Sequence, residues 1–165
     1  MLLSLCMNNQ NDTTSEQARA KGIIIPEPPK TGAYHVAVVR TGNLLYHSGQ
    51  TPIVDGEKVL LGTVGVDLTP EQAEEAARIA AMNMIAQISA FLGGQLDRVR
   101  RCVRLTGYVN SAPDFYEQPQ VIHGASKAVL DVFGEERGLH ARAVFGMTPM
   151  PFNVCVVIDG IWEVE

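Results

Sequence analysis

The chain has 165 residues, of which 46% are hydrophobic and 19% charged, and a globular protein of this size buries a sizeable core without disulfides or metals. Its net charge of −5 argues against a binding surface for nucleic acid or for an anionic membrane. No run reaches the roughly 20 apolar residues of a membrane span, and residues 1–7 lack the basic region of a signal peptide. The three cysteines, Cys6, Cys102 and Cys155, have no paired spacing, which favours inert thiols in a cytoplasmic protein over a zinc or redox motif.

We expect an N-terminal tail and short helix over residues 1–22, followed by one domain at 23–165. Ser15 is a suitable N-cap for the short helix, and Gly22 is a suitable terminator. Residues 26–29 contain three prolines, which lack amide donors and exclude a helix there.

A hairpin is predicted next. Its strands span 32–40 and 44–48, because β-branched and aromatic residues fill two short runs on either side of a Thr-Gly-Asn turn. Asp55 and Gly56 mark a further turn.

The clearest helix start in the chain is at Thr69. This threonine is the N-cap, Pro70 takes the first helical position, and Gln72 stands where a capping box requires it. Apolar residues then recur at helical spacing as far as the glycines at 93–94, so an amphipathic helix with one core-facing side is predicted.

A third strand is predicted at 100–110, and a second helical region from residue 111 to Phe133. Pro119 must restart or kink that helix because proline cannot donate the intrahelical hydrogen bond. Residues 134–138 then return the chain to the last pair of strands.

The last pair of strands flanks a proline-rich turn at 147–151, and the final strand lies within 153–165. Side chains alternate between the faces of a strand, so His140, Arg142 and Val144 should share one face. An arginine among small and apolar residues must be paired, because a guanidinium is costly to bury alone. Arg142 is therefore either a structural ion-pair member or an anchor for an acidic ligand.

The order of two strands, helix, strand, helix and two strands predicts an α+β two-layer sandwich with a mixed sheet of five or six strands. Two helices about 10 Å wide cover one face of such a sheet and no more. Apolar side chains nevertheless point in both directions from the first and last strands, which would leave a large apolar patch on a monomer. We therefore expect an oligomer in which sheets pack together.

The motifs, taken in order, resemble those of the YjgF/Rid family, the imine and enamine deaminases once labelled endoribonuclease L-PSP. The resemblance covers about residues 30–165. It rests on five segments: Gly32-Ala-Tyr34, Gly42 to Gln50, the Thr69-Pro70 helix start, Gly107 to Phe115, and Ala141-Arg142 followed by Met150-Pro151. Membership implies a chorismate-mutase-like fold, and a homotrimer with a ligand cleft between each pair of neighbouring subunits.

The resemblance also implies site residues. Arg142 matches the arginine that holds the substrate carboxylate in the deaminases, and we take it as the catalytic candidate. The substrate-binding candidates are Tyr34, Ser48, Gly49, Ser126, His140 and Val144, and neither a cofactor nor a metal is expected.

One departure from the family concerns position 157. Fifteen residues after the arginine, active deaminases carry a glutamate that activates water, and this chain has Val157. Asp159 points to the same face of the strand but lies about 7 Å further along it. Loss of that carboxylate removes the base and leaves the binding site.

Two functions of different kinds follow. The first is a trimer that binds small 2-oxo or 2-imino acids and has weak or no deaminase activity. The second is an active enamine or imine deaminase, in which His140 or ordered water assists proton transfer.

An endoribonuclease is a third reading, supported by the arginines of residues 98–104. Those charges alternate with apolar residues as on a solvated strand, and no aromatic residue stands among them to stack bases. The four histidines show no metal-ligand spacing.

Overall fold

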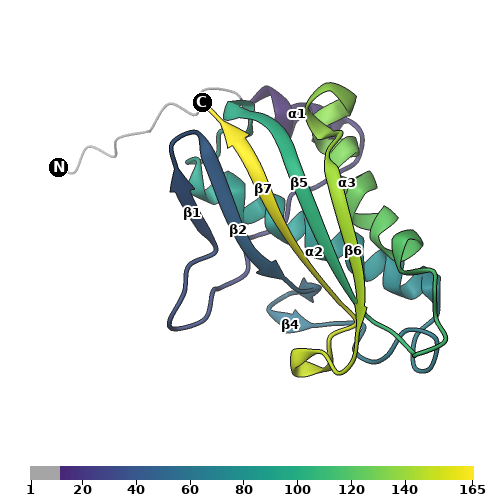
Figure 1. Ribbon diagram of the computed structural model, residues 1–165. Coiled ribbons are helices and arrows are strands. Elements are labelled where there is room, and N and C mark those ends of the chain that lie inside the picture. Colours follow the sequence, from purple (N-terminus) through teal and green to yellow (C-terminus); the bar gives the residue numbers. More distant parts are fainter. Residues whose placement is uncertain (1–11) are drawn as a thin grey trace.

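A computed structural model describes residues 12–165, and Figure 1 shows a sheet with the helices gathered on one side of it. The sheet has five strands in the order β1-β2-β7-β5-β6, and it contains both parallel and antiparallel pairs. This confirms the predicted α+β sandwich with a mixed sheet. The strands are β1 (Val38–Thr41), β2 (Leu44–Gln50), β5 (Val99–Asn110), β6 (Ala141–Met147) and β7 (Val156–Val164).

Strand β5 occupies the middle of the last three strands. It pairs antiparallel with β7 and parallel with the edge strand β6. Parallel neighbours need a crossover connection, and here α3 (Gln118–Gly138) provides it behind the sheet (Figure 1). The register places Arg142 beside Leu105, which is fully buried against the helices.

The helix layer is built on α2 (Pro70–Phe91), whose predicted capping box is present. Thr69 accepts a hydrogen bond from the Gln72 amide, and the Gln72 side chain accepts one from the Thr69 amide. The buried stripe of α2 is rich in alanine, which lets another helix approach closely. At the crossing with α3, Gly124 has no room for a Cβ, because that atom would overlap the Glu74 carbonyl oxygen.

Two predicted element starts were wrong. The first strand begins at Val38 and not at residue 32, because β2 is irregular between His47 and Gln50 and its regular ladder with β1 ends at the pair of Val38 and His47. Residues 111–117 are not helical and include a turn at Pro113-Asp114, and α3 starts at Gln118. Pro119 therefore lies in the first helical turn, where its missing amide hydrogen costs nothing, so it does not kink a longer helix.

The end of α3 also differs from the prediction. Gly134 has φ 74°, which interrupts the helix just after the predicted end at Phe133, but a further helical turn follows as far as Gly138. The strand β7 begins at Val156, within the predicted range.

The short helix α1 (Thr13–Ala20) is capped by Asp12 and not by Ser15. Its first turn is attached to the domain by Asp97, in the 3-10 turn η1 (Leu96–Arg98), which accepts hydrogen bonds from the Thr13 and Thr14 amides at 2.8 Å each. Residues 1–11, where we predicted a tail, and Cys6 with them, lie outside the described part of the chain.

The predicted Asp55-Gly56 turn joins two strands that the sequence analysis did not predict, β3 (Ile53–Val54) and β4 (Glu57–Lys58), into a small hairpin. Its approach to the helix layer is held by Asn83 of α2, whose amide nitrogen donates to the Thr51 and Ile53 carbonyl oxygens. The remaining element is the 3-10 turn η2 (Pro151–Asn153) before β7.

Among the described residues, neither cysteine is reactive. Cys102 and Cys155 are buried free thiols, and burial raises the pKa of each to about 12. No helix formed by residues 12–165 has the length and apolarity to cross a bilayer.

The face of the sheet opposite the helices is open, as Figure 1 shows. Side chains on this face include Tyr46 of β2 and Phe145 of β6, exposed to 46% and 52%, and Tyr108 of β5 stacks on Phe145 with ring centroids 6.0 Å apart. The open face therefore carries exposed apolar side chains, as predicted.

We predict that Gly124→Ala lowers the free energy of unfolding by about 1–3 kcal/mol, because the added methyl group forces α2 and α3 apart. Chemical denaturation measures the change. The control is His123→Ala at the exposed neighbouring position of the same helix, which should cost less than about 0.5 kcal/mol. Equal stability of Gly124→Ala and the wild type would refute the close approach.

Candidate functional site

Arg142 lies on the helix-facing side of the edge strand β6. Its Nη1 donates a hydrogen bond to Ser126 Oγ of α3 at 3.2 Å, and the residue is otherwise exposed. Within residues 12–165, no carboxylate lies within 4.0 Å of its guanidinium, although four other pairs of charged side chains do meet. Of the two readings of this arginine, the structural ion pair therefore lacks a partner in the described part of the chain.

Ser126 and His140 extend this contact into a short hydrogen-bonded chain. The two side chains meet at 3.0 Å between Ser126 Oγ and His140 Nε2, and His140 Nδ1 lies 2.6 Å from the Gly138 carbonyl oxygen. A carbonyl only accepts, so Nδ1 carries the proton and Nε2 accepts the hydrogen of the serine hydroxyl. We call Ser126, His140 and Arg142 the edge cluster.

His140 is neutral in this arrangement. Burial lowers its pKa below the ordinary value of 6.5, the hydrogen bond to Gly138 opposes that effect, and the positive charge of Arg142 lowers the pKa further. The ring is half-buried, so an unprotonated Nε2 is available near neutral pH.

The prediction that His140, Arg142 and Val144 share one face of a strand is correct for two of the three residues. Arg142 and Val144 belong to β6 and face the helices, and Val144 packs on the core. His140 precedes the strand, which starts at Ala141, and it reaches the same side through its bond to Ser126.

The other predicted residues lie elsewhere. Ser48 and Gly49 belong to β2, and the Ser48 hydroxyl donates to the Val36 carbonyl oxygen at 2.6 Å. Tyr34 is fully exposed in the loop before β1. The strand order puts β2 three strands from β6, which is roughly 14 Å. One small molecule cannot touch both groups within one chain.

Val157 lies beside the β2 group and not beside Arg142. A Cβ at Gly49 would come within 2.8 Å of Val157 Cγ1, so the glycine makes room for the valine on the open face. Arg142 faces the helices on the other side of the sheet. In a single chain, the arginine and the position of the family glutamate are therefore on opposite faces.

Sequence reasoning missed one polar pair on the open face. Tyr108 of β5 donates its phenolic hydrogen to Asp159 of β7 at 3.0 Å, and partial burial, followed by this bond, raises the pKa of Tyr108. The alternation of side chains along β7 does predict that Asp159 lies on the same face as Val157. The partner of Asp159 depends on the β5–β7 register, in which Thr106 and not Tyr108 stands opposite it.

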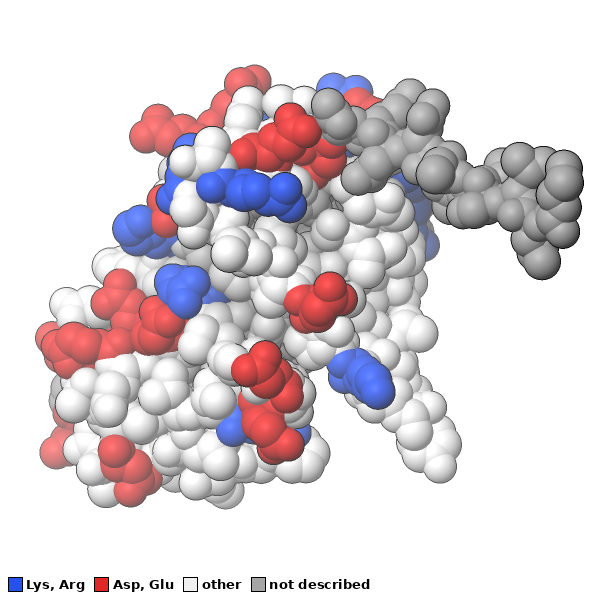
Figure 2. All heavy atoms as spheres, turned by 180° about the vertical axis from the view of Figure 1, so that it is seen from behind, with Lys and Arg blue, Asp and Glu red and all other residues white. Residues whose placement is uncertain are grey.

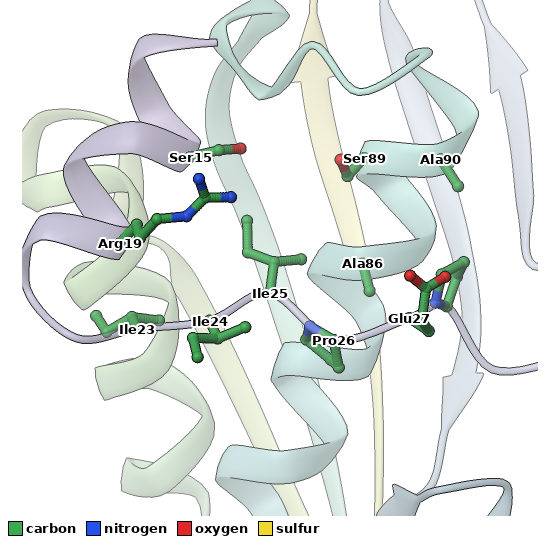
Figure 3. Close-up of a pocket in the computed structure, with 11 residues that line it drawn as sticks. Ser15, Arg19, Ile23, Ile24, Ile25, Pro26, Glu27, Ala86, Ser89 and Ala90 are labelled. Carbon is green, nitrogen blue, oxygen red and sulfur yellow. The ribbon is translucent and has the colours of Figure 1, made fainter.

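Two cavities lie on the far side of the helix layer, away from the edge cluster. One, of about 260 Å³, is lined by α1, residues 23–28 and α2; Figure 3 shows Arg19 and Ser15 on one side of it and Ser89 on the other. The second, of about 830 Å³, lies between residues 24–30, the β3–β4 hairpin and α2. Neither cavity includes a predicted site residue.

The charges of the molecule do not suggest a nucleic-acid surface. Figure 2 shows acidic and basic side chains interspersed on the helix side. In the basic segment 98–104, Arg100 pairs with Glu165 at 3.1 Å and Arg101 with Glu163 at 3.7 Å. Across residues 12–165, no three side chains of His, Cys, Asp or Glu converge on a possible metal site.

Fold and site together define an α+β sandwich whose edge strand carries an arginine with no carboxylate partner among residues 12–165. The family model described as "YjgF/chorismate_mutase-like, putative endoribonuclease" matches residues 16–162. The chain belongs to this YjgF family.

Individual relatives are similar to this chain over most of its length. Protein TCP17 of Trypanosoma cruzi is 41% identical over 144 residues, which are 87% of this chain and 89% of that protein. Atu1372 from Agrobacterium tumefaciens, a protein of unknown function, is 41% identical in sequence. Its crystal structure superposes with a TM-score of 0.86, and the match covers 93% of this chain and 94% of Atu1372.

We predict that the pKa of His140 lies below 6.5 and rises in Arg142→Gln, because the substitution removes a positive charge that lowers it. Nitrogen-15 NMR titration of the imidazole rings measures both values. In the control Arg40→Gln, a guanidinium that bonds the Gly42 and Glu165 carbonyl oxygens is lost far from the edge cluster, and the pKa should not move. A fall in the pKa of Arg142→Gln would contradict the assigned contact.

Proposed function

We propose that the protein is a homotrimer that binds small carboxylate-bearing metabolites, such as 2-oxo or 2-imino acids, in clefts between subunits. Its 2-imino acid deaminase activity is weak or absent. The carboxylate is held by Arg142, whose planar fork fits it with two hydrogen bonds. The cytoplasmic location expected from the cysteines belongs to the same proposal.

The observation that carries this proposal is the unpaired guanidinium of Arg142. An arginine held by one serine hydroxyl, with no carboxylate near it in residues 12–165, retains most of its donors for a ligand. Val144 lies two residues along the same side of β6, and the outer edge of this strand offers unpaired backbone groups to the same ligand.

The separation of the predicted residues supports a site completed by a second copy. Tyr34, Ser48 and Gly49 lie at the opposite end of the strand order from Arg142, and Tyr34 extends into solvent without a contact that would explain an aromatic side chain there. A neighbouring subunit that covers the open face would bring one copy's β2 group toward another copy's edge cluster. The apolar residues of the open face supply the free energy for that association.

Val157 supports binding rather than rapid turnover. Imine hydrolysis needs a water aimed at carbon, and a valine neither accepts a proton nor orients water. The pair of Tyr108 and Asp159 favours the alternative, an active deaminase, because it places a carboxylate on the same face two residues away.

We predict a mass of three times the 17.9 kDa of one chain by light scattering at micromolar concentration. Phe145→Glu places a charge on the open face and should dissociate the trimer. The control is Phe91→Glu, at a phenylalanine of similar exposure, 45%, at the end of α2, and it should leave the mass unchanged. A wild-type mass of one chain would end the trimer proposal.

Arg142→Ala should weaken the binding of 2-oxobutanoate by roughly 30- to 150-fold, because a charge-assisted bidentate contact contributes about 2–3 kcal/mol. Isothermal titration calorimetry measures the affinity, and light scattering checks that the trimer survives. Arg101→Ala removes an exposed arginine elsewhere on the sheet and should bind like the wild type. Equal affinities for Arg142→Ala and the wild type would remove the anchor from the proposal.

Val157→Glu should raise the hydrolysis of freshly generated 2-iminopropanoate by about 10²- to 10⁴-fold, the usual contribution of a positioned general base. Val157→Gln is the matched control, since it has the same length and no basic carboxylate, and it should stay at the wild-type rate. Rapid hydrolysis by the wild type, with no gain in Val157→Glu, would favour the deaminase alternative and direct attention to Asp159.

A further inference from the structure

The edge cluster contains a second set of reactive groups beside the carboxylate anchor. A serine hydroxyl that donates to an unprotonated imidazole nitrogen, with the other ring nitrogen donating to a fixed acceptor, is the arrangement that activates serine as a nucleophile. The 3.0 Å contact between Ser126 and His140 and the 2.6 Å contact between His140 and Gly138 supply both bonds.

We propose that Ser126 and His140 form a catalytic dyad that cleaves activated esters or thioesters of short-chain acids by acyl transfer to Ser126. This activity goes beyond the proposed binding function. It shares Arg142 with that function but does not require a 2-oxo acid to bind.

Each member of the edge cluster has a chemical part in this reaction. His140 Nε2 removes the hydroxyl proton as Ser126 Oγ attacks the acyl carbon. The Gly138 carbonyl oxygen holds the proton on Nδ1 and so keeps the ring in the tautomer that can accept at Nε2. Arg142 Nη1, 3.2 Å from Ser126 Oγ, is close enough to stabilise the negative charge that develops on the former carbonyl oxygen.

The bonds and protons of the proposed reaction balance without a further reactant except water. In the first half, the Ser126 Oγ to acyl carbon bond forms, the bond to the leaving alkoxide or thiolate breaks, and the leaving group takes the proton from His140. In the second half, a water gives its proton to His140 and attacks the acyl-serine. The acid leaves, and the proton returns to Ser126 Oγ.

The positions of the two residues in the fold favour a reactive pair over a simple link between elements. Ser126 lies within the regular part of α3, ahead of the break at Gly134, and His140 lies beyond the helix end at Gly138, so the two residues are held by different segments. Both side chains are half-buried, which leaves a path for an acyl group. The serine and histidine are also adjacent to an edge strand, where no neighbouring strand in residues 12–165 covers them.

The test is acylation of the full chain by p-nitrophenyl acetate. We expect a burst of p-nitrophenolate, and an acetyl group on the peptide that contains Ser126, located by fragment mass spectrometry. Ser126→Ala and His140→Gln should each lower the burst rate by about 10²-fold or more.

Ser89→Ala on α2 (Figure 3) is the matched control, a half-buried helical serine away from the edge cluster, and it should retain the full burst. An acetyl group found on Lys127 or another lysine instead of Ser126, or an unchanged burst in Ser126→Ala, would overturn the dyad.

Titration with 2-oxobutanoate separates this inference from the proposed function. If 2-oxobutanoate binds through Arg142 but the wild type is not acylated, the dyad alone is wrong. If Ser126 is acylated but Arg142→Ala does not change 2-oxobutanoate binding, the dyad stands and the proposed carboxylate site fails.

Discussion

The position of Arg142 depends on the parallel pairing of β5 with β6. Because these strands run in the same direction, the chain between them must cross behind the sheet, and α3 makes that crossing. The register sets Arg142 beside Leu105 and thus points the guanidinium toward the helix that carries Ser126. A shift of one residue would turn the arginine to the open face.

Close packing between the sheet and the helices also determines where Ser126 lies. Gly107 of β5 leaves space for Ile122 of α3, and Gly124 lets α3 approach α2 at the Glu74 carbonyl. Both contacts limit where α3 can lie along the sheet. Ser126, half a turn beyond Gly124, is placed at the sheet edge by the same contacts that build the core.

The residues of the proposed site lie on both faces of the sheet. The covered face carries the arginine, a neutral histidine and a serine at its edge, while the open face carries Gly49, Val157 and the apolar residues suited to contact another copy. A binding cleft that needs both faces can form only between chains. The two cavities described above lie beyond the helices and include neither group of residues.

Local sequence signals were sufficient for the order of the helices and of the strands in the main sheet, but not for the small β3–β4 hairpin. The capping residues at Thr69 to Gln72 and the alternation of β7 act between neighbours in the chain, so the α2 start and the apolar open face could be predicted from the residues alone. The same reasoning placed the first strand and the second helix too early. Whether residues 32–37 pair, and where α3 begins, depends on partners distant in the chain.

The sequence by itself determined the fold class, the family and the identity of the candidate anchor, because periodicity, caps and motif order are properties of adjacent residues. Only the tertiary structure decided what Arg142 contacts. The lack of a carboxylate partner for it within residues 12–165, the bonds that link Ser126 to His140, and the opposite faces of Arg142 and Val157 all follow from strand register and helix crossing. Those are set by packing between segments far apart in the chain, which no local pattern encodes.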